Sequence, residues 1–161
     1  MLGQTEKKIF LNIAEGKVTR RVGNGRVEKY DFVEGTLERI YKREREFRGE
    51  KVLYWYLDIK DTKGGDIYSL GIHSTSGVWR SIILSLGSVE SFLFPIKICP
   101  YRKGEYDKVV VYSGDTRLDW VSELPPVEVV DVQGEKIKSS AKREKYISEL
   151  VDKVNGKIQG L

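Results

Sequence analysis

Apolar and polar residues alternate most regularly between Phe32 and His73. Val, Ile, Leu, Tyr and Trp recur there with a period of two, and turn residues interrupt the pattern twice. This pattern predicts three consecutive β-strands, over Phe32 to Phe47, Lys51 to Asp61 and Ile67 to His73. The chain is therefore expected to be organised around a β-meander.

The middle strand of this meander divides its residues into two chemically different faces. Side chains of a strand alternate between the two sides of the sheet. One side is aliphatic apart from a tryptophan and predicts a core, and it carries Leu53, Trp55, Leu57 and Ile59. The other side is an aromatic surface that a core does not require, and it carries Tyr54, Tyr56 and Asp58.

The first strand of the meander requires an irregularity. Val33 and Leu37 have the same parity as Arg39, but a strand cannot change its buried face without an extra residue. A β-bulge near Glu38 is therefore expected. Such a bulge buries Ile40 and turns one basic and aromatic row outward beside Tyr54 and Tyr56, namely Arg39, Tyr41, Arg43 and Arg45.

The flanking segments predict further elements. Alternation around Glu15-Gly16 predicts a hairpin over Lys8 to Val22. Helical spacing from Val78 to Leu86 predicts a short helix. Two more strands are expected, the first around Ile96 between Pro95 and Pro100 and the second over Lys108 to Tyr112, with a loop from Tyr101 to Asp107 between them. Beyond Pro126 we expect an edge strand over Val127 to Val132, and a helix from Ser139 or Ser140 with an apolar stripe from Ile147 to Ile158.

These elements suggest three segments in a chain of 161 residues. Residues 1–30 form an N-terminal hairpin extension, residues 31–123 the compact core, and residues 124–161 a C-terminal extension with a basic amphipathic helix. The length suits one well-buried domain with appendages.

Charge is distributed unevenly along the chain. The first 50 residues contain 12 basic and 9 acidic side chains, residues 51–133 contain 9 and 11, and residues 134–161 contain 7 and 4. Basic ends permit a polyanionic partner without requiring one. No apolar run approaches the roughly 20 residues of a membrane span, and the polar segment from Met1 to Lys8 does not resemble a secretory signal. We expect no membrane association.

Catalytic chemistry is not expected. The chain has one histidine, His73, and one cysteine, Cys99, so a His- or Cys-rich metal site cannot be built within it. A lone cysteine favours a reducing, cytoplasmic setting. Asp58, Asp61 and Asp66 have oxygen ligands for Mg²⁺, but hairpin turns attract aspartate for local reasons. We expect a protein that is not an enzyme and needs no cofactor or metal.

The order of three strands, a helix and two strands, together with Tyr41, Tyr54-Trp55-Tyr56 and two basic loops, resembles phage-type or bacterial single-stranded DNA-binding proteins. The resemblance covers about half of the chain. It implies an OB-fold, a five-stranded Greek-key barrel with a short helix between its third and fourth strands. It also implies a groove across the second and third strands, flanked by Lys42 to Glu50 and Tyr101 to Asp107. Unlike many bacterial members, this chain ends in a basic segment rather than an acidic tail.

Single-stranded DNA can be held without sequence preference when rings stack on bases and Arg and Lys follow the phosphates. The expected function is therefore such binding in replication or recombination, as in a phage or mobile element. RNA is an equally permissible ligand for stacking. The candidate nucleic-acid-binding residues are Arg39, Tyr41, Arg43, Arg45, Tyr54, Tyr56, Arg80, Lys97, Arg102 and Lys103.

Two alternatives stay open at this point. Tyr54 and Tyr56 can equally pack beneath the N-terminal hairpin or the C-terminal helix, and Arg43 and Arg45 can pair with surface acids. The protein can also be a protein-interaction or oligomerisation module, in which the aromatic face and the stripe from Ile147 to Ile158 are subunit contacts.

Overall fold

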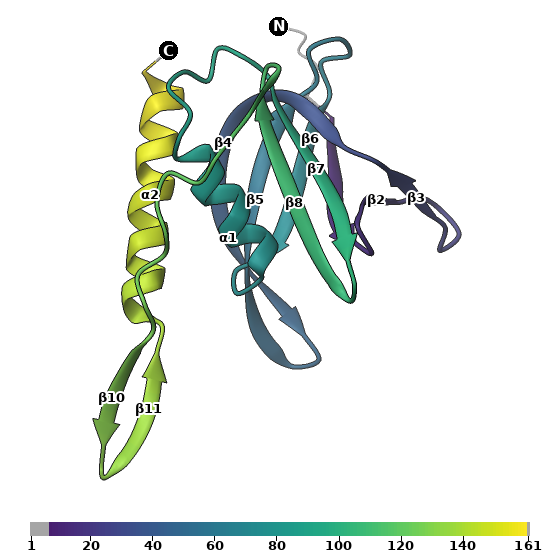
Figure 1. Cartoon of the computed structure of the whole chain (residues 1–161). Helices are drawn as coiled ribbons and strands as arrows, with labels where there is room; N and C mark the ends of the chain where they lie inside the picture. The colour runs from purple at the N-terminus through teal and green to yellow at the C-terminus, as the bar shows by residue number, and fades with distance from the viewer. Residues whose placement is uncertain (1–6, 161) are drawn as a thin grey trace, which may run out of the picture.

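The structure is a computed structural model that describes residues 7–160. The expectation for the polar N-terminus falls largely on residues 1–6, which lie outside the described part, as does Leu161. The fold is mainly β, with two helices (Figure 1). The strands are β1 (Lys8–Ala14), β2 (Lys17–Arg21), β3 (Val27–Tyr30), β4 (Val33–Phe47), β5 (Glu50–Lys60), β6 (Ile67–His73), β7 (Ile96–Lys103), β8 (Tyr106–Ser113), β9 (Thr116–Arg117), β10 (Glu128–Val132) and β11 (Glu135–Ser139); the helices are α1 (Gly77–Leu86) and α2 (Ala141–Gln159).

Nine strands form one sheet in the order β3-β2-β1-β6-β5-β4-β7-β8-β9. Neighbouring strands are antiparallel except β1 and β6, which run parallel. The predicted meander corresponds to β4, β5 and β6, and the predicted N-terminal hairpin to β1 and β2. The sheet is not closed, because β6 pairs with β1 and β8 lies near the other end of the strand order.

β4 changes neighbours along its length, which gives the sheet its bend. Its start, Val33–Gly35, pairs with β7, and the part from Thr36 onward pairs with β5. Gly35 stands where this exchange occurs, and a Cβ atom there would lie 2.3 Å from the carbonyl oxygen of Lys60. Only glycine fits such a close approach of two backbones.

The predicted bulge is confirmed by the register between β4 and β5. Leu37 lies opposite Ile59 and Arg39 opposite Asp58, so that Glu38 has no partner position. The extra residue moves the buried face from Leu37 to Ile40, both of which are buried. It also sends the side chains of Arg39, Tyr41, Arg43 and Arg45 to the opposite side of the sheet.

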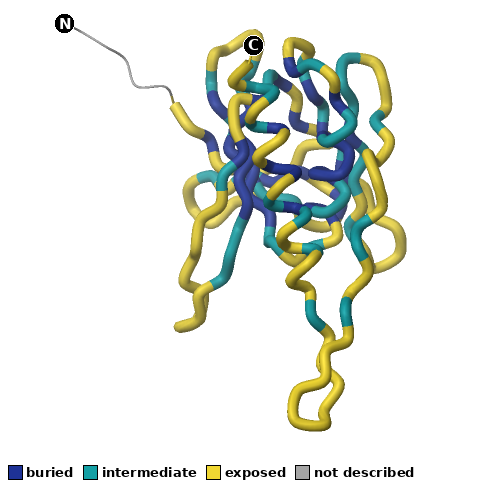
Figure 2. Tube along the Cα trace, turned by 90° about the vertical axis from the view of Figure 1, so that its left-hand side faces the viewer, coloured by how far each residue is buried: buried dark blue, intermediate teal, exposed yellow. Residues whose placement is uncertain are grey.

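One hydrophobic core joins the three segments expected from the sequence. It includes Leu11 from β1, Trp79 from α1 and Val151 from α2. Figure 2 colours the buried stretches of the chain dark blue. Trp55 and Trp79 stack within it at 5.2 Å between ring centroids. The apolar stripe of α2 packs on the body of its own chain, with Ile147, Leu150, Val151 and Val154 buried. That stripe is therefore not an exposed subunit contact.

Three expectations about strands need correction. The predicted strand around Ile96 does not end at Pro100, because β7 continues to Lys103 and the expected loop is only a short turn. Beyond Ile98, β8 is the only strand paired with β7 among the described residues, so the missing amide of a proline is tolerated there. β3 was not expected, and the predicted edge strand β10 pairs with β11 in a separate hairpin rather than joining the main sheet.

Within residues 7–160, no helix is long and apolar enough to cross a membrane.

Candidate nucleic-acid interface

The outward sides of β4, β5, β6 and β1 form one continuous surface, which we call the binding face. The strand registers align its residues in rows across the sheet. In one row Arg39 lies opposite Asp58, Asp58 opposite Ser69, and Ser69 opposite Phe10. The next rows contain Tyr41 with Tyr56, and Arg43 with Tyr54. Six of the predicted residues are thus brought together, as their parity and the bulge indicated.

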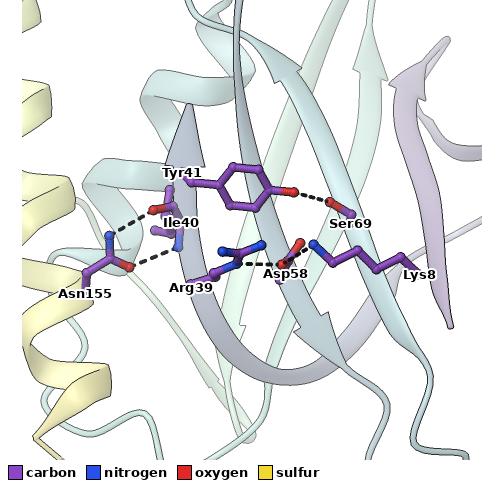
Figure 3. A network of polar contacts seen from close by, with 7 residues as sticks. All are labelled: Lys8, Arg39, Ile40, Tyr41, Asp58, Ser69 and Asn155. Carbon is purple, nitrogen blue, oxygen red and sulfur yellow. Dashed lines mark hydrogen bonds and ion pairs between the residues drawn. The ribbon is translucent and has the colours of Figure 1, made fainter. Parts of the chain in front are cut away.

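Asp58 occupies the centre of a polar network on this face (Figure 3). Its side chain is only 3% exposed, and its Oδ2 lies 2.9 Å from Nε of Arg39 and 3.0 Å from Nζ of Lys8. Beside it, the Tyr41 hydroxyl and Ser69 Oγ are 3.3 Å apart. Two cations against one carboxylate leave this network with a net positive charge. Arg39 is accordingly committed to Asp58, although its side chain is 57% exposed.

Burial and ion pairing act in opposite directions on Asp58. Burial alone raises the pKa of its carboxyl, but hydrogen bonds from Arg39, Lys8 and Ser69 together lower that pKa below its ordinary value. The same hydrogen bond to Asp58 raises the pKa of Arg39. The carboxylate thus stays ionised at neutral pH and holds two strands, β4 and β1, on either side of β5 and β6.

Tyr56 points to the predicted face but is not an open stacking platform, which corrects the expectation from the sequence. Tyr56 is only 3% exposed. The Tyr41 ring stacks on it at 5.4 Å and 17°, and the edge of Phe10 approaches at 6.5 Å. Its ring also lies against Gly71, where a Cβ atom would be 2.7 Å from Tyr56 Cε1. Burial raises the pKa of Tyr56, and we assign this ring a supporting role beneath the face.

The arginines of β4 differ in whether an acidic side chain pairs with them. The Arg45 guanidinium lies over the rings of Tyr54 and Tyr56, at 5.0 and 5.4 Å from their centroids. Such a cation–π contact keeps the guanidinium flat on the face while its charge is available to an anion. Arg43 is exposed and lies opposite Tyr54. Neither arginine forms an ion pair with an acid in the described part of the chain, unlike Arg39.

A groove of about 1030 Å³ crosses the N-terminal side of the binding face. One side of the groove is the three-stranded antiparallel unit of β1, β2 and β3. The other side is the projecting end of the β4–β5 hairpin. Three aromatic side chains line it: Phe10, Phe47 and Tyr54. Its lining has one acidic side chain, Glu15, and six basic ones: Lys7, Lys8, Arg20, Arg21, Lys29 and Arg45. A smaller hollow of about 300 Å³ shares Phe10 and Arg45 with the groove and adds Arg43, Glu44 and Tyr56.

Of the ten predicted residues, only Arg45 and Tyr54 line this groove. Arg43 and Tyr56 line the smaller hollow, and Arg39 and Tyr41 belong to the network around Asp58. The other four lie elsewhere. Lys97 lies against Phe32, with its Nζ 4.4 Å from the ring centroid. Arg102 donates to the Glu105 carbonyl at 3.1 Å and flanks the tip of the β1–β2 hairpin at Gly16. Lys103 is exposed at the end of β7, and Arg80 is half-buried on α1. The structure therefore gives these four no common surface with the arginines of β4.

Sequence reasoning missed the contribution of the N-terminal hairpin. The groove residues that it did not identify include Lys8, Phe10, Arg21, Lys29 and Phe47. A signal was present in β1, where Lys8, Phe10 and Asn12 alternate with the apolar Ile9, Leu11 and Ile13. That alternation gives the outward side of β1 the same basic and aromatic character as β4, but it does not say which strand β1 pairs with.

Comparison of the chain with protein-family models, with curated proteins and with solved structures finds no match.

Proposed function

We propose that this protein binds single-stranded DNA along the groove beside β1. Phosphates would contact the basic side chains, and bases would stack on Phe10, Phe47 and Tyr54. The observation that carries the proposal is the composition of the groove, six basic side chains and three aromatic rings against one acid. A single strand needs this combination, because every base has a stackable face and every linkage carries a charge.

The exposure of the rings supports the same function. Phe47 is 64% exposed and Phe10 is 48% exposed. Large apolar side chains left open beside cations are typical of surfaces that receive bases. The mechanism is stoichiometric: the protein covers the bases, prevents re-formation of a duplex and presents the strand to other proteins during replication or recombination.

We further propose that β4 to β8 form an opened OB-type barrel. Supporting this are the order of three strands, α1 and two strands, and the antiparallel pairing of β4 with both β5 and β7. In this proposal β1 occupies the edge of β6 that the fifth strand takes in a closed barrel. The parallel pairing of β1 with β6 then adds three strands, β1, β2 and β3, to the sheet beside β6.

Two features of the sequence favoured the alternative function, a protein-interaction module: the aromatic face and the apolar stripe of α2. The structure removes the second. The apolar stripe of α2 is buried against the core of the same chain. The other support, the aromatic face, is surrounded by cations, which favours a polyanion over an apolar protein surface.

Titration of a fluorescently labelled oligo-dT, followed by anisotropy at low salt, tests the proposal. The variant is Phe47→Ser, which removes an exposed ring from the groove. Its matched control is Phe94→Ser, because Phe94 is 61% exposed and does not line the groove. Loss of one stacked base is worth about 1 to 3 kcal/mol, so we expect Phe47→Ser to bind about tenfold more weakly. Equal affinities of Phe47→Ser, Phe94→Ser and the unmodified protein would contradict a stacking groove.

A further inference from the structure

A second hollow of about 510 Å³ adjoins the groove and shares Asn12 and Tyr54 with it. It lies between the end of β1, the paired ends of β5 and β6, the start of α1 and the β7–β8 turn. We call it the end pocket. A strand lying in the groove passes its mouth at Asn12 and Tyr54, so one nucleotide can turn into it.

The charge of the end pocket differs from that of the groove. Its lining includes two carboxylates, Glu105 and Asp107, and one lysine, Lys108. Carboxylates repel a phosphate but accept hydrogen bonds from N–H groups. The end pocket is therefore suited to the hydrogen-bonding edge of a base rather than to the backbone.

The two carboxylates are not equally available. Asp107 Oδ1 accepts from the backbone N–H of Gly16 at 2.6 Å and lies 4.0 Å from Nε of Arg102. The Glu105 carboxylate has no hydrogen-bond or ion-pair partner among residues 7–160. Glu105 is thus the free acceptor of the pocket. Its neighbour Tyr106 is 72% exposed and offers a ring for stacking.

His73 lines the same pocket and can supply a donor. The backbone N–H of Thr75 donates to His73 Nδ1 at 3.2 Å, so this nitrogen is the acceptor of the ring. In the neutral imidazole the proton then resides on Nε2, which becomes a donor. The Tyr54 ring meets His73 edge to face at 5.4 Å. The pocket thereby combines a free carboxylate with an imidazole N–H donor.

We infer that the end pocket binds a guanine base of the single strand held in the groove. Guanine has two adjacent N–H donors, at N1 and N2, beside the acceptor O6. A carboxylate such as Glu105 can accept both donors, and His73, which lines the same pocket, would supply a donor to O6. No other DNA base places two adjacent N–H donors beside a carbonyl on that edge. This inference depends on the proposed function and refines it, since one position of an otherwise unselected strand would be read.

The test compares two labelled oligonucleotides, dT12 and the same oligonucleotide with one central dG, by anisotropy at low salt. The variant is Glu105→Gln, which keeps the size of the side chain but removes the carboxylate. The matched control is Glu90→Gln, since Glu90 is also exposed and does not line the pocket. The readout is the ratio of the two affinities, because removing any acid near a polyanion strengthens binding of both oligonucleotides alike.

A bidentate contact to a base discriminates by about 1 to 3 kcal/mol, so we expect the dG oligonucleotide to bind about tenfold more tightly. Glu105→Gln should bring the ratio close to one, and Glu90→Gln should leave it unchanged. Two further oligonucleotides, with a central dA or dC in place of dG, test the choice of base. A ratio near one in the unmodified protein, an unchanged ratio in Glu105→Gln, or tighter binding of the dA or dC oligonucleotide than of the dG oligonucleotide would overturn the guanine pocket and leave the proposed function intact. No binding of either oligonucleotide would overturn the proposed function as well.

Discussion

Asn155 of α2 makes a two-way contact with the backbone of Ile40 in β4. Its Nδ2 donates to the Ile40 carbonyl at 2.9 Å, and its Oδ1 accepts from the Ile40 N–H at 2.9 Å. The side-chain amide thereby replaces the strand that β4 lacks on this edge, directly after the bulge. It holds β4 directly before its outward basic and aromatic residues, so the C-terminal helix supports the binding face from the edge of β4.

Asn155→Ala should destabilise the fold, because Ile40 is buried and two of its backbone groups would lose their partner. An unsatisfied buried group costs about 1 to 3 kcal/mol. We expect the free energy of unfolding to fall by about 2 kcal/mol, measured by urea denaturation. Lys153→Ala, an exposed substitution on the same helix, should change it little. A similar stability for both variants would show that the contact contributes nothing.

Asp58→Asn should reduce stability at neutral pH, because Arg39 and Lys8 would lose their counter-charge. We expect a loss of about 2 kcal/mol, less than for a fully buried pair since both cations are partly exposed. The pKa of Asp58 is lowered in the folded state. Its contribution is thus present above the unfolded pKa of about 3.9 and is lost as the pH falls through the lower folded pKa.

The stability difference between the unmodified protein and Asp58→Asn should therefore shrink below about pH 4. Denaturant titrations at a series of pH values measure it. A difference that stays constant from pH 7 to acid, or that grows on acidification, would contradict the assigned ion pairs.

Gly71→Ala tests the support of the aromatic cluster. The added Cβ atom would lie 2.7 Å from Tyr56 Cε1, so the ring must move away from Gly71 and its packing against Tyr41 must change. Overpacking of this kind costs about 1 to 3 kcal/mol, which thermal or urea unfolding can detect. Gly23→Ala is the control, because nothing lies within 4 Å of its added Cβ atom. Equal stability of the two variants would mean that Tyr56 is free to move.

Arg21→Gln should weaken binding of oligo-dT and also reduce its salt dependence. Arg21 is exposed at the end of β2 and lines the groove. Each phosphate contact to a single strand contributes about 0.7 to the slope of log K against log salt. We expect the slope to decrease by about that amount, whereas Lys153→Gln, on α2 and outside the groove, should not change it. An unchanged slope in Arg21→Gln would remove Arg21 from the interface.

Much of the binding face could be predicted from alternation alone. The parity of Leu37 and Ile40 required a bulge, and the bulge placed Arg43 and Arg45 beside Tyr54. The position of β1 could not be predicted, because alternation identifies the two sides of a strand but not its neighbours in the sheet. The burial of Tyr56 depends on the pairing of β1 with β6 and on Gly71, which lies opposite Tyr56 on β6. Both are contacts between separate strands, which a local pattern does not indicate.

The C-terminal region illustrates the same limit. The spacing of apolar residues predicted α2, and its stripe was equally compatible with packing on the core or on a partner. The contact of Asn155 with Ile40 spans 115 residues of sequence, and no local pattern indicates it. Similarly, the two-residue turn at Gln133 and Gly134, both with positive φ, pairs β10 with β11 although only β10 was expected.

The most direct test of the central claim is the salt dependence of oligo-dT binding by the unmodified protein, measured by anisotropy over a range of KCl concentrations. With about five phosphates neutralised in the groove, log K should fall linearly with log salt with a slope of about −3.5. Tight binding at low salt that weakens with such a slope is the predicted result. Absence of binding at low salt, or an affinity independent of salt, would contradict a single-strand-binding groove.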